Sequence, residues 1–170
     1  MLDRYQRIMI AVDETEASLK AVQYVARMMA GRKDVHVRLF HVLPPLPPDL
    51  LEHGGSELPE QEQLLSDQLR MAQHKWTAQA RQSAQQSLGS ALVVLVEHGI
   101  PSQNLSTAFS TSVNPTDISA EILRAAGEWD CATVVTGRHD LSWMQEILHR
   151  HVGDQVVQSG KDMAVTVVPS

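Results

Sequence analysis

Residues 7–31, RIMIAVDETEASLKAVQYVARMMAG, contain the change of pattern that decides the fold. The opening RIMIAV is a short apolar run that includes β-branched residues, which predicts a strand buried on both faces. From Thr15 onward the apolar residues follow helical spacing, and Gly31 is placed to end the helix. The stretch therefore predicts a strand that stops at Asp13, followed by a helix that returns the chain to the sheet.

The next apolar run, residues 35–42 (VHVRLFHV), alternates as a strand does and completes a β-α-β unit. Such crossovers are almost always right-handed and join parallel strands. Residues 43–59 then carry five prolines and two glycines, which remove backbone donors and interrupt regular structure. This segment is predicted to be a Pro-rich surface loop.

A long amphipathic helix is predicted from Glu60 to His98, because apolar residues recur about every four positions from Leu65 to Leu92. Periodicity alone leaves the run Ala91 to Val96 open, since six apolar residues fit a buried strand as well as a helix end. We interpret it as the end of the helix, which stops near Gly99.

The remaining chain predicts three more strands and two more helices. The strands cover residues 105–113, 131–136 and 164–168. The first of the two helices begins after Asn114-Pro115-Thr116, and the second covers residues 142–159. The alternating order predicts an α/β fold of Rossmann-like type, with an open five-stranded parallel sheet and helices on both faces. A chain of 170 residues is expected to form one domain, residues 1–170.

Composition excludes several classes of partner. A net charge of −6 leaves no excess of Lys and Arg for a nucleic-acid backbone or an anionic membrane surface. No apolar run approaches the roughly 20 residues of a membrane-spanning helix. The lone Cys131 cannot form an internal disulfide and no secretory leader is evident, so we expect a soluble, cytoplasmic protein.

Several motifs, in order along the chain, resemble the universal stress protein family. They are IMIAVDETEAS, LFHVLP, LVEHGIPSQNL, DISAEILRAA, WDCATVVTGR and AVTVVP, and they extend from Arg7 to Pro169. The resemblance implies an adenine nucleotide alpha hydrolase-like fold and settles the run 91–96 as helix. It also implies that some members bind ATP through an Asp after the first strand, a hydrophobic seat after the second, and a signature G-x-x-G-x9-G-[ST].

The chain keeps only part of that ATP-binding pattern. The positions that match are Asp13, Val42, Thr136, Gly137 and Val152. The positions that depart are Asp140 and Arg150, where the second and third signature glycines are expected, and His151, where Ser or Thr is expected. The thirteen-residue interval from Gly137 to Arg150 is kept, so the length of the loop is preserved while its chemistry is not.

These departures weaken a phosphate site for a physical reason. Glycines let backbone N–H groups approach anionic oxygens, whereas Asp140 would add a negative charge beside an anionic ligand. Two like charges about 4 Å apart cost roughly 4 kcal/mol at an effective dielectric of 20. Alternatively, the guanidinium of Arg150 could replace the missing donors, helped by Arg138 and His151. The sequence thus leaves three readings open: no small-molecule cofactor, an altered anion site, or ATP binding.

Other readings compete at the same positions. Asp13 could simply cap the helix that follows it. A metal enzyme would recruit His139, His149 and His151, but no zinc-binding motif and no nucleophile turn supports catalysis. We therefore expect no catalytic residues and no metal site. The resemblance implies a homodimer through the last strand, where Val165, Val167 and Val168 would contribute to the edge, and an unidentified protein partner is possible as well.

Overall fold

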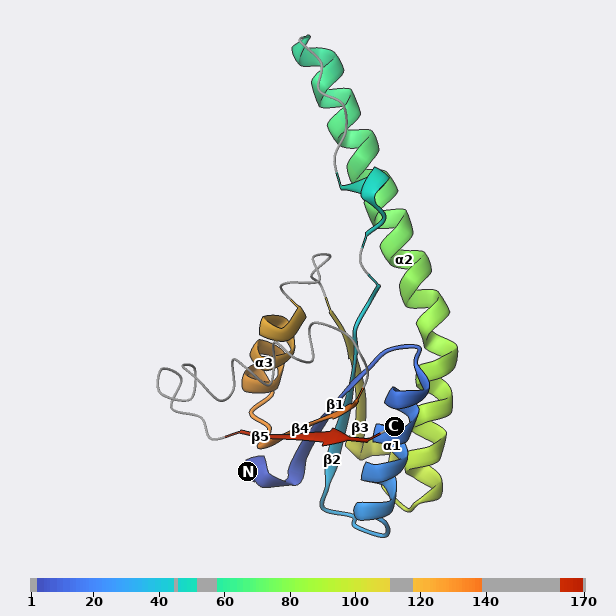
Figure 1. The fold of residues 1–170 in the computed structure, drawn as a ribbon, viewed down its shortest axis with the longest axis vertical. Helices are drawn as coiled ribbons and strands as arrows, with labels where there is room; N and C mark the ends of the chain where they lie inside the picture. The colour runs from blue at the N-terminus through green and yellow to red at the C-terminus, as the bar shows by residue number, and fades with distance from the viewer. Residues whose placement is uncertain (1–2, 45, 52–57, 111–117, 139–162, 170) are drawn as a thin grey trace.

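Five parallel strands form one sheet in the order β3-β2-β1-β4-β5 (Figure 1). The computed structural model describes residues 3–44, 46–51, 58–110, 118–138 and 163–169. The strands are β1 (Arg7–Val12), β2 (His36–His41), β3 (Leu105–Phe109), β4 (Thr133–Gly137) and β5 (Ala164–Val168). Every neighbouring pair is parallel, which confirms the predicted open five-stranded sheet.

Three α-helices connect these strands within the described residues. They are α1 (Glu16–Met28), α2 (Pro59–Glu97) and α3 (Ile118–Glu128). Three single turns of 3₁₀-helix accompany them: η1 (Arg4–Gln6), η2 (Pro48–Leu50) and η3 (Ser102–Asn104). Helix α1 begins after Thr15, whose side chain accepts a hydrogen bond from the backbone N–H of Ser18 at 3.4 Å.

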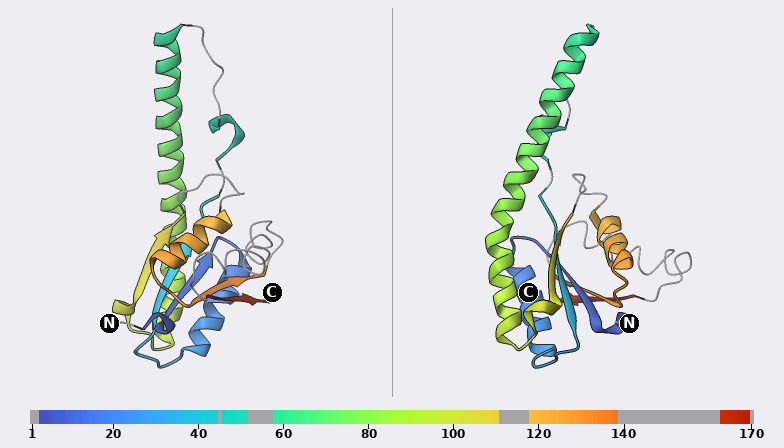
Figure 2. Two further views of the ribbon diagram at one scale, coloured as in Figure 1. Left: turned by 90° about the vertical axis from the view of Figure 1, so that its left-hand side faces the viewer. Right: turned by 180° about the vertical axis from the view of Figure 1, so that it is seen from behind.

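The helices cover both faces of the sheet, as predicted. On one face α1 and α2 pack over a core that contains Ile10, Val25 and Leu39. On the other face α3 packs over a second core, which contains Met9 and Ile122 (Figure 2). Alternate residues of β1 enter the two cores, which is why its sequence is an uninterrupted apolar run.

Helix α2 matches the predicted long helix, and residues 91–96 are helical as interpreted. Only its carboxyl-terminal half packs into the domain, where Ala84, Leu88, Ala91 and Leu95 are buried. The amino-terminal half extends well beyond the sheet (Figures 1 and 2). We call residues 59–80 of α2 the arm; none of them is buried.

The Pro-rich segment is not a surface loop throughout. Leu43 and Leu46 are buried, and the backbone N–H of Leu43 donates to Ser110 Oγ at 2.9 Å. Gln73 on the arm donates through Nε2 to the carbonyl oxygen of Leu50 at 2.8 Å. The start of this segment therefore belongs to the core, because Leu43 before the prolines and Leu46 between them are apolar and buried.

Two predicted elements lie partly or wholly outside the described residues. Strand β3 ends at Phe109, and residues 111–113 of the predicted strand are not described. The predicted helix 142–159 also lies outside the described part of the chain. Among the helices that the structure describes, none combines the length and apolar character needed to cross a membrane.

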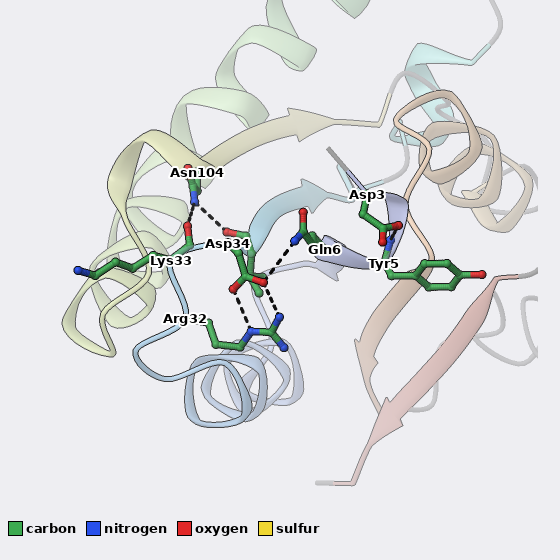
Figure 3. Close-up of polar contacts among 8 residues, drawn as sticks. Asp3, Tyr5, Gln6, Arg32, Lys33, Asp34 and Asn104 are labelled. Carbon is green, nitrogen blue, oxygen red and sulfur yellow. Dashed lines mark hydrogen bonds and ion pairs between the residues drawn. The ribbon is translucent and has the colours of Figure 1, made fainter. Parts of the chain in front are cut away.

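Polar contacts fasten the amino edge of the sheet, where the strands begin (Figure 3). Asn104 Nδ2 donates to the carbonyl oxygens of Lys33 at 2.9 Å and Val35 at 3.1 Å. Asp34 accepts from Arg32 Nη2 at 2.6 Å and from Gln6 Nε2 at 3.3 Å. The segments that enter β1, β2 and β3 are thus tied together. The candidate site lies at the other end of these strands, which we call the carboxyl edge of the sheet.

Candidate functional site

Three of the predicted site residues meet at the carboxyl edge of the sheet. Asp13 follows β1, Val42 follows β2, and Gly137 ends β4. Strand β1 lies between the other two, with Val12 opposite His41 and Ala11 opposite Thr136. In open parallel sheets ligands bind outside this edge, where the connections diverge to opposite faces. The strand order alone therefore brings these residues to the expected place.

Asp13 is engaged by the first turn of α1. Its Oδ1 accepts hydrogen bonds from Thr15 N at 2.9 Å, Thr15 Oγ1 at 2.5 Å and Ser18 Oγ at 2.7 Å. The backbone N–H of Asp13 in turn donates to Ser18 Oγ at 2.9 Å. A carboxylate at a helix N-terminus is also stabilised by the helix dipole. Thr15, not Asp13, is the N-cap of α1, so the sequence-based alternative that Asp13 caps this helix is wrong; Asp13 instead holds the capping residue Thr15 and the side chain of Ser18.

Gly137 lies against the backbone of α1. A Cβ at this position would lie 2.1 Å from the carbonyl oxygen and 2.3 Å from the carbonyl carbon of Ala17. No side chain can move to relieve such a contact, because both atoms belong to the backbone. The packing of β4 against α1 therefore requires glycine here, whether or not a ligand binds.

A small cavity lies beside Asp13, between α1, α2 and the ends of β1 and β2. It has a volume of about 50 Å³, and its lining includes Asp13, Ser18, His41 and Ser87. Typical sites for small organic ligands enclose about 300–1,000 Å³. The cavity has room for a water molecule.

His41 is the residue at this edge that sequence reasoning missed. Its side chain is 1% exposed, and neither ring nitrogen has a hydrogen-bond partner within the described structure. The ring lies 5.8 Å from that of Phe109, centroid to centroid. Burial lowers the pKa of His41 below its ordinary value, and the carboxylates of Glu14 and Asp13 partly offset this effect. The signal available in the sequence was a histidine two residues after Leu39, on the alternation that points into the core.

Val42 and Thr136 have mainly structural surroundings. Val42 is buried in the core on the α3 side, and its backbone N–H donates to the carbonyl oxygen of Val12 at 2.8 Å. Thr136 is buried at the end of β4. The predicted positions Asp140, Arg150, His151 and Val152 lie outside the described residues.

Strand β5 forms one edge of the sheet, as predicted for a dimer contact. Ala164 N donates to Ala132 O at 2.8 Å, and Val168 O accepts from Arg138 N at 2.7 Å. Backbone groups alternate along a strand, so Val165 and Val167 direct their N–H and C=O groups away from β4. Val168 is buried, whereas Val165 and Val167 are half-buried against the second core.

The structure gives no support to a metal centre in the part of the chain that it describes. No group of three or more His, Cys, Asp or Glu side chains gathers there. His139, His149 and His151, which a metal enzyme would recruit, lie outside that part. Cys131 is fully buried, and burial raises the pKa of its thiol.

Comparison with known proteins agrees with this architecture. Residues 4–169 match the universal stress protein family. A universal stress protein family structure from Burkholderia pseudomallei superposes with a TM-score of 0.61 at 15% identity, covering 99% of this chain and 98% of that one. A universal stress protein from Archaeoglobus fulgidus in complex with dAMP has a TM-score of 0.56 at 17% identity and covers 99% of both chains.

A third solved structure, a universal stress protein in complex with cAMP, has a TM-score of 0.54 at 15% identity and covers 98% of both chains. At these identities the structures establish the fold alone. A search of curated proteins gives no significant match.

Proposed function

We propose that this chain, which belongs to the universal stress protein family, is a cytoplasmic, non-catalytic regulatory or interaction module. In this proposal it acts as a homodimer and does not hold ATP in the way that the ATP-binding signature implies. The alternative is a family member that binds a nucleotide or another phosphate ligand through a rewritten loop. Both functions concern the carboxyl edge of the sheet. They differ in whether a nucleotide or another phosphate ligand binds there.

The observation that carries the proposal is the internal engagement of Asp13. The residue that the resemblance assigns to adenosine already accepts three hydrogen bonds through Oδ1 from Thr15 and Ser18. A ligand hydroxyl that bonded to Oδ1 would compete with the exposed Thr15 and the buried Ser18, and leaving the Ser18 hydroxyl unpaired would cost about 1–3 kcal/mol. The first signature glycine, Gly137, is likewise accounted for by its contact with Ala17.

The remaining signature positions support the same proposal through their charge and size. Asp140 places a carboxylate, and Arg150 a long side chain, at positions where glycine lets the backbone approach phosphate. His151 replaces a small hydroxyl residue. Repulsion of the order of 4 kcal/mol from one carboxylate corresponds to about a thousandfold loss of affinity.

Titration calorimetry with Mg·ATP tests the proposal against a restored signature. The comparison is between the native chain and the triple variant Asp140→Gly, Arg150→Gly, His151→Ser. We expect no measurable binding to the native chain at about 1 mM ATP, and at least tenfold tighter binding by the variant. Micromolar binding to the native chain would contradict the proposal.

The alternative has one observation in its favour, because two similar solved structures are complexes with dAMP and cAMP. Nucleotides with a single phosphate carry less charge than ATP and would meet less repulsion from Asp140. The same calorimetry with AMP and cAMP separates the two functions. Binding that is lost in Arg150→Ala would favour a rewritten anion site in which the guanidinium contacts phosphate.

The proposed dimer rests on the position of β5 as an edge strand of the sheet. Outward N–H and C=O groups at Val165 and Val167 offer a second strand a short ladder of hydrogen bonds. Light scattering at micromolar concentration is expected to give at least twice the mass of one chain. The mass of a single chain would exclude this dimer.

A further inference from the structure

The outer face of the arm carries an apolar stripe. Leu64, Met71 and Ala78 are seven residues apart, so they lie on one side of the helix two turns from each other. All three are exposed, with 58% exposure at Leu64 and 65% at Met71. Gln68 and Lys75 lie between them, which completes the alternating three- and four-residue spacing of a helix-pairing seam. The spacing fits another helix as the occupant of this face.

The distribution of charges along α2 indicates which helix would occupy this face. The acidic residues of the first part are Glu60, Glu62 and Asp67, with no basic residue among them. The basic residues of the following part are Arg70, Lys75 and Arg81, with no acidic residue among them. A parallel copy would bring like charges together, whereas an antiparallel copy brings each acidic part beside a basic part. The sequence of charges is therefore complementary to itself.

A two-fold axis at Met71 satisfies both patterns at once. It places Met71 opposite its own copy, Leu64 opposite Ala78, and Asp67 opposite Lys75, because each pair is equally spaced about position 71. The arm extends twelve residues from Met71 to Pro59, and the first buried residue in the other direction is Ala84, thirteen residues away. Both distances are about 18–20 Å along a helix. The tip of a second arm would reach the body of the domain without entering it.

We propose that the arm pairs in antiparallel fashion with the arm of a second copy of this chain, along the stripe formed by Leu64, Met71 and Ala78. This contact is separate from the proposed strand contact. Helix α2 packs near β2 and β3, whereas β5 is the opposite edge of the sheet. Two independent two-fold contacts would link more than two chains.

Cysteine cross-linking tests the arrangement residue by residue. The native thiol, Cys131, is fully buried, so the full-length chain is a suitable background. Met71→Cys is expected to form an intermolecular disulfide under mild oxidation, because position 71 meets itself at the axis. Leu64→Cys alone is expected to remain uncross-linked, and the double variant Leu64→Cys, Ala78→Cys to cross-link. Cross-linking of Leu64→Cys as efficient as that of Met71→Cys, or none at Met71→Cys, would overturn the proposal.

Sedimentation velocity gives a second, reversible readout. Met71→Glu places two carboxylates at the axis and is expected to weaken the arm contact at least tenfold, so that the mass falls to that of the strand-linked dimer, or of one chain if the strand contact does not form. Gln63→Glu is the matched control: it is exposed on the same helix, about 100° away from Leu64, and is expected to leave the mass unchanged. Equal masses for the two variants would contradict the arm contact. Because the arm contact joins two chains whether or not the strand contact forms, a failed strand contact does not hide this result.

Discussion

The carboxyl edge of the sheet and the arm of α2 differ in how far their side chains make contacts within the chain. At the sheet edge Asp13 is bonded to Thr15 and Ser18, and the space beside Gly137 is filled by Ala17. On the arm, Leu64 and Met71 remain largely exposed. In the described part of the place where the family resemblance puts a nucleotide, Asp13 and Gly137 thus make internal contacts, while apolar side chains on the arm are exposed. This contrast favours a function carried by contacts between proteins.

The largest effect is expected from Gly137→Ala, which tests how tightly the sheet edge is closed. A methyl group would lie 2.1 Å from the carbonyl oxygen of Ala17, so β4 and α1 would have to separate. We expect a loss of at least about 4 kcal/mol in the free energy of unfolding, measured by denaturant titration.

Gly89→Ala is the matched control for this substitution. Within the described residues, nothing beyond the backbone of its own helix lies within 4 Å of the added methyl group. The variant should gain about 1 kcal/mol, because alanine favours the helix interior over glycine. A neutral Gly137→Ala would show that the sheet edge is loosely packed.

A pair of leucine truncations on one helix compares the two halves of α2. Leu88 is 5% exposed in the core, whereas Leu64 is 58% exposed on the arm. Leu88→Ala is expected to cost about 3 kcal/mol of unfolding free energy, and Leu64→Ala less than about 0.5 kcal/mol. Thermal or urea unfolding measures both. Similar losses at the two positions would mean that the arm is packed within its own chain.

The strands and helices on the two sides of this comparison could be predicted from the sequence, but the packing of α2 could not. The apolar run in β1, the alternation in β2 and the start of α1 near Thr15 each depend on neighbouring residues, and each prediction was confirmed. The helical period from Leu65 to Leu92 is the same whether or not a sheet lies beneath it. Sequence periodicity therefore could not show that burial in α2 begins only at Ala84.

The candidate site shows the same limit. The sequence predicted an open parallel sheet with Asp13, Val42 and Gly137 at strand ends, and the structure supplies the strand order that brings them together. The contact between Gly137 and Ala17 joins residues 120 positions apart, and no local pattern encodes it. The isolation of the His41 ring nitrogens likewise depends on which side chains surround them in space.

A smaller effect is expected from Ser18→Ala, which opens the network around Asp13. The hydroxyl donates to Asp13 Oδ1 and accepts from the Asp13 N–H, and Ser18 is buried. Its loss should cost about 2 kcal/mol of unfolding free energy, because the partly buried N–H of Asp13 loses its acceptor. Ser90→Ala serves as the control: Ser90 is exposed on α2 and its Oγ donates to Gln86 O at 3.2 Å. If both serines prove equally dispensable, Asp13 is less constrained than its contacts indicate.

The smallest effect concerns pH and His41. Its pKa in the folded protein is lower than the 6.5 of the unfolded chain, so the unfolded chain binds more protons as the pH falls. The native protein should therefore lose stability from about pH 7 downward, until the folded-state pKa is passed. His41→Leu should reduce this loss, whereas His74→Gln, at an exposed position of the arm, should not. Denaturant titrations at pH 7.5 and 5.5 measure the unfolding free energy of each protein. The same change in unfolding free energy between the two pH values in all three proteins would exclude a contribution from His41.

The most direct measurement is the nucleotide content of the protein as purified. Native, undialysed protein is denatured by heat, the precipitate is removed, and the supernatant is analysed by mass spectrometry. The proposal that the contacts of Asp13 with Ser18 and of Gly137 with Ala17 stand in place of a ligand predicts no stoichiometric nucleotide. Recovery of one ATP per chain would contradict the account.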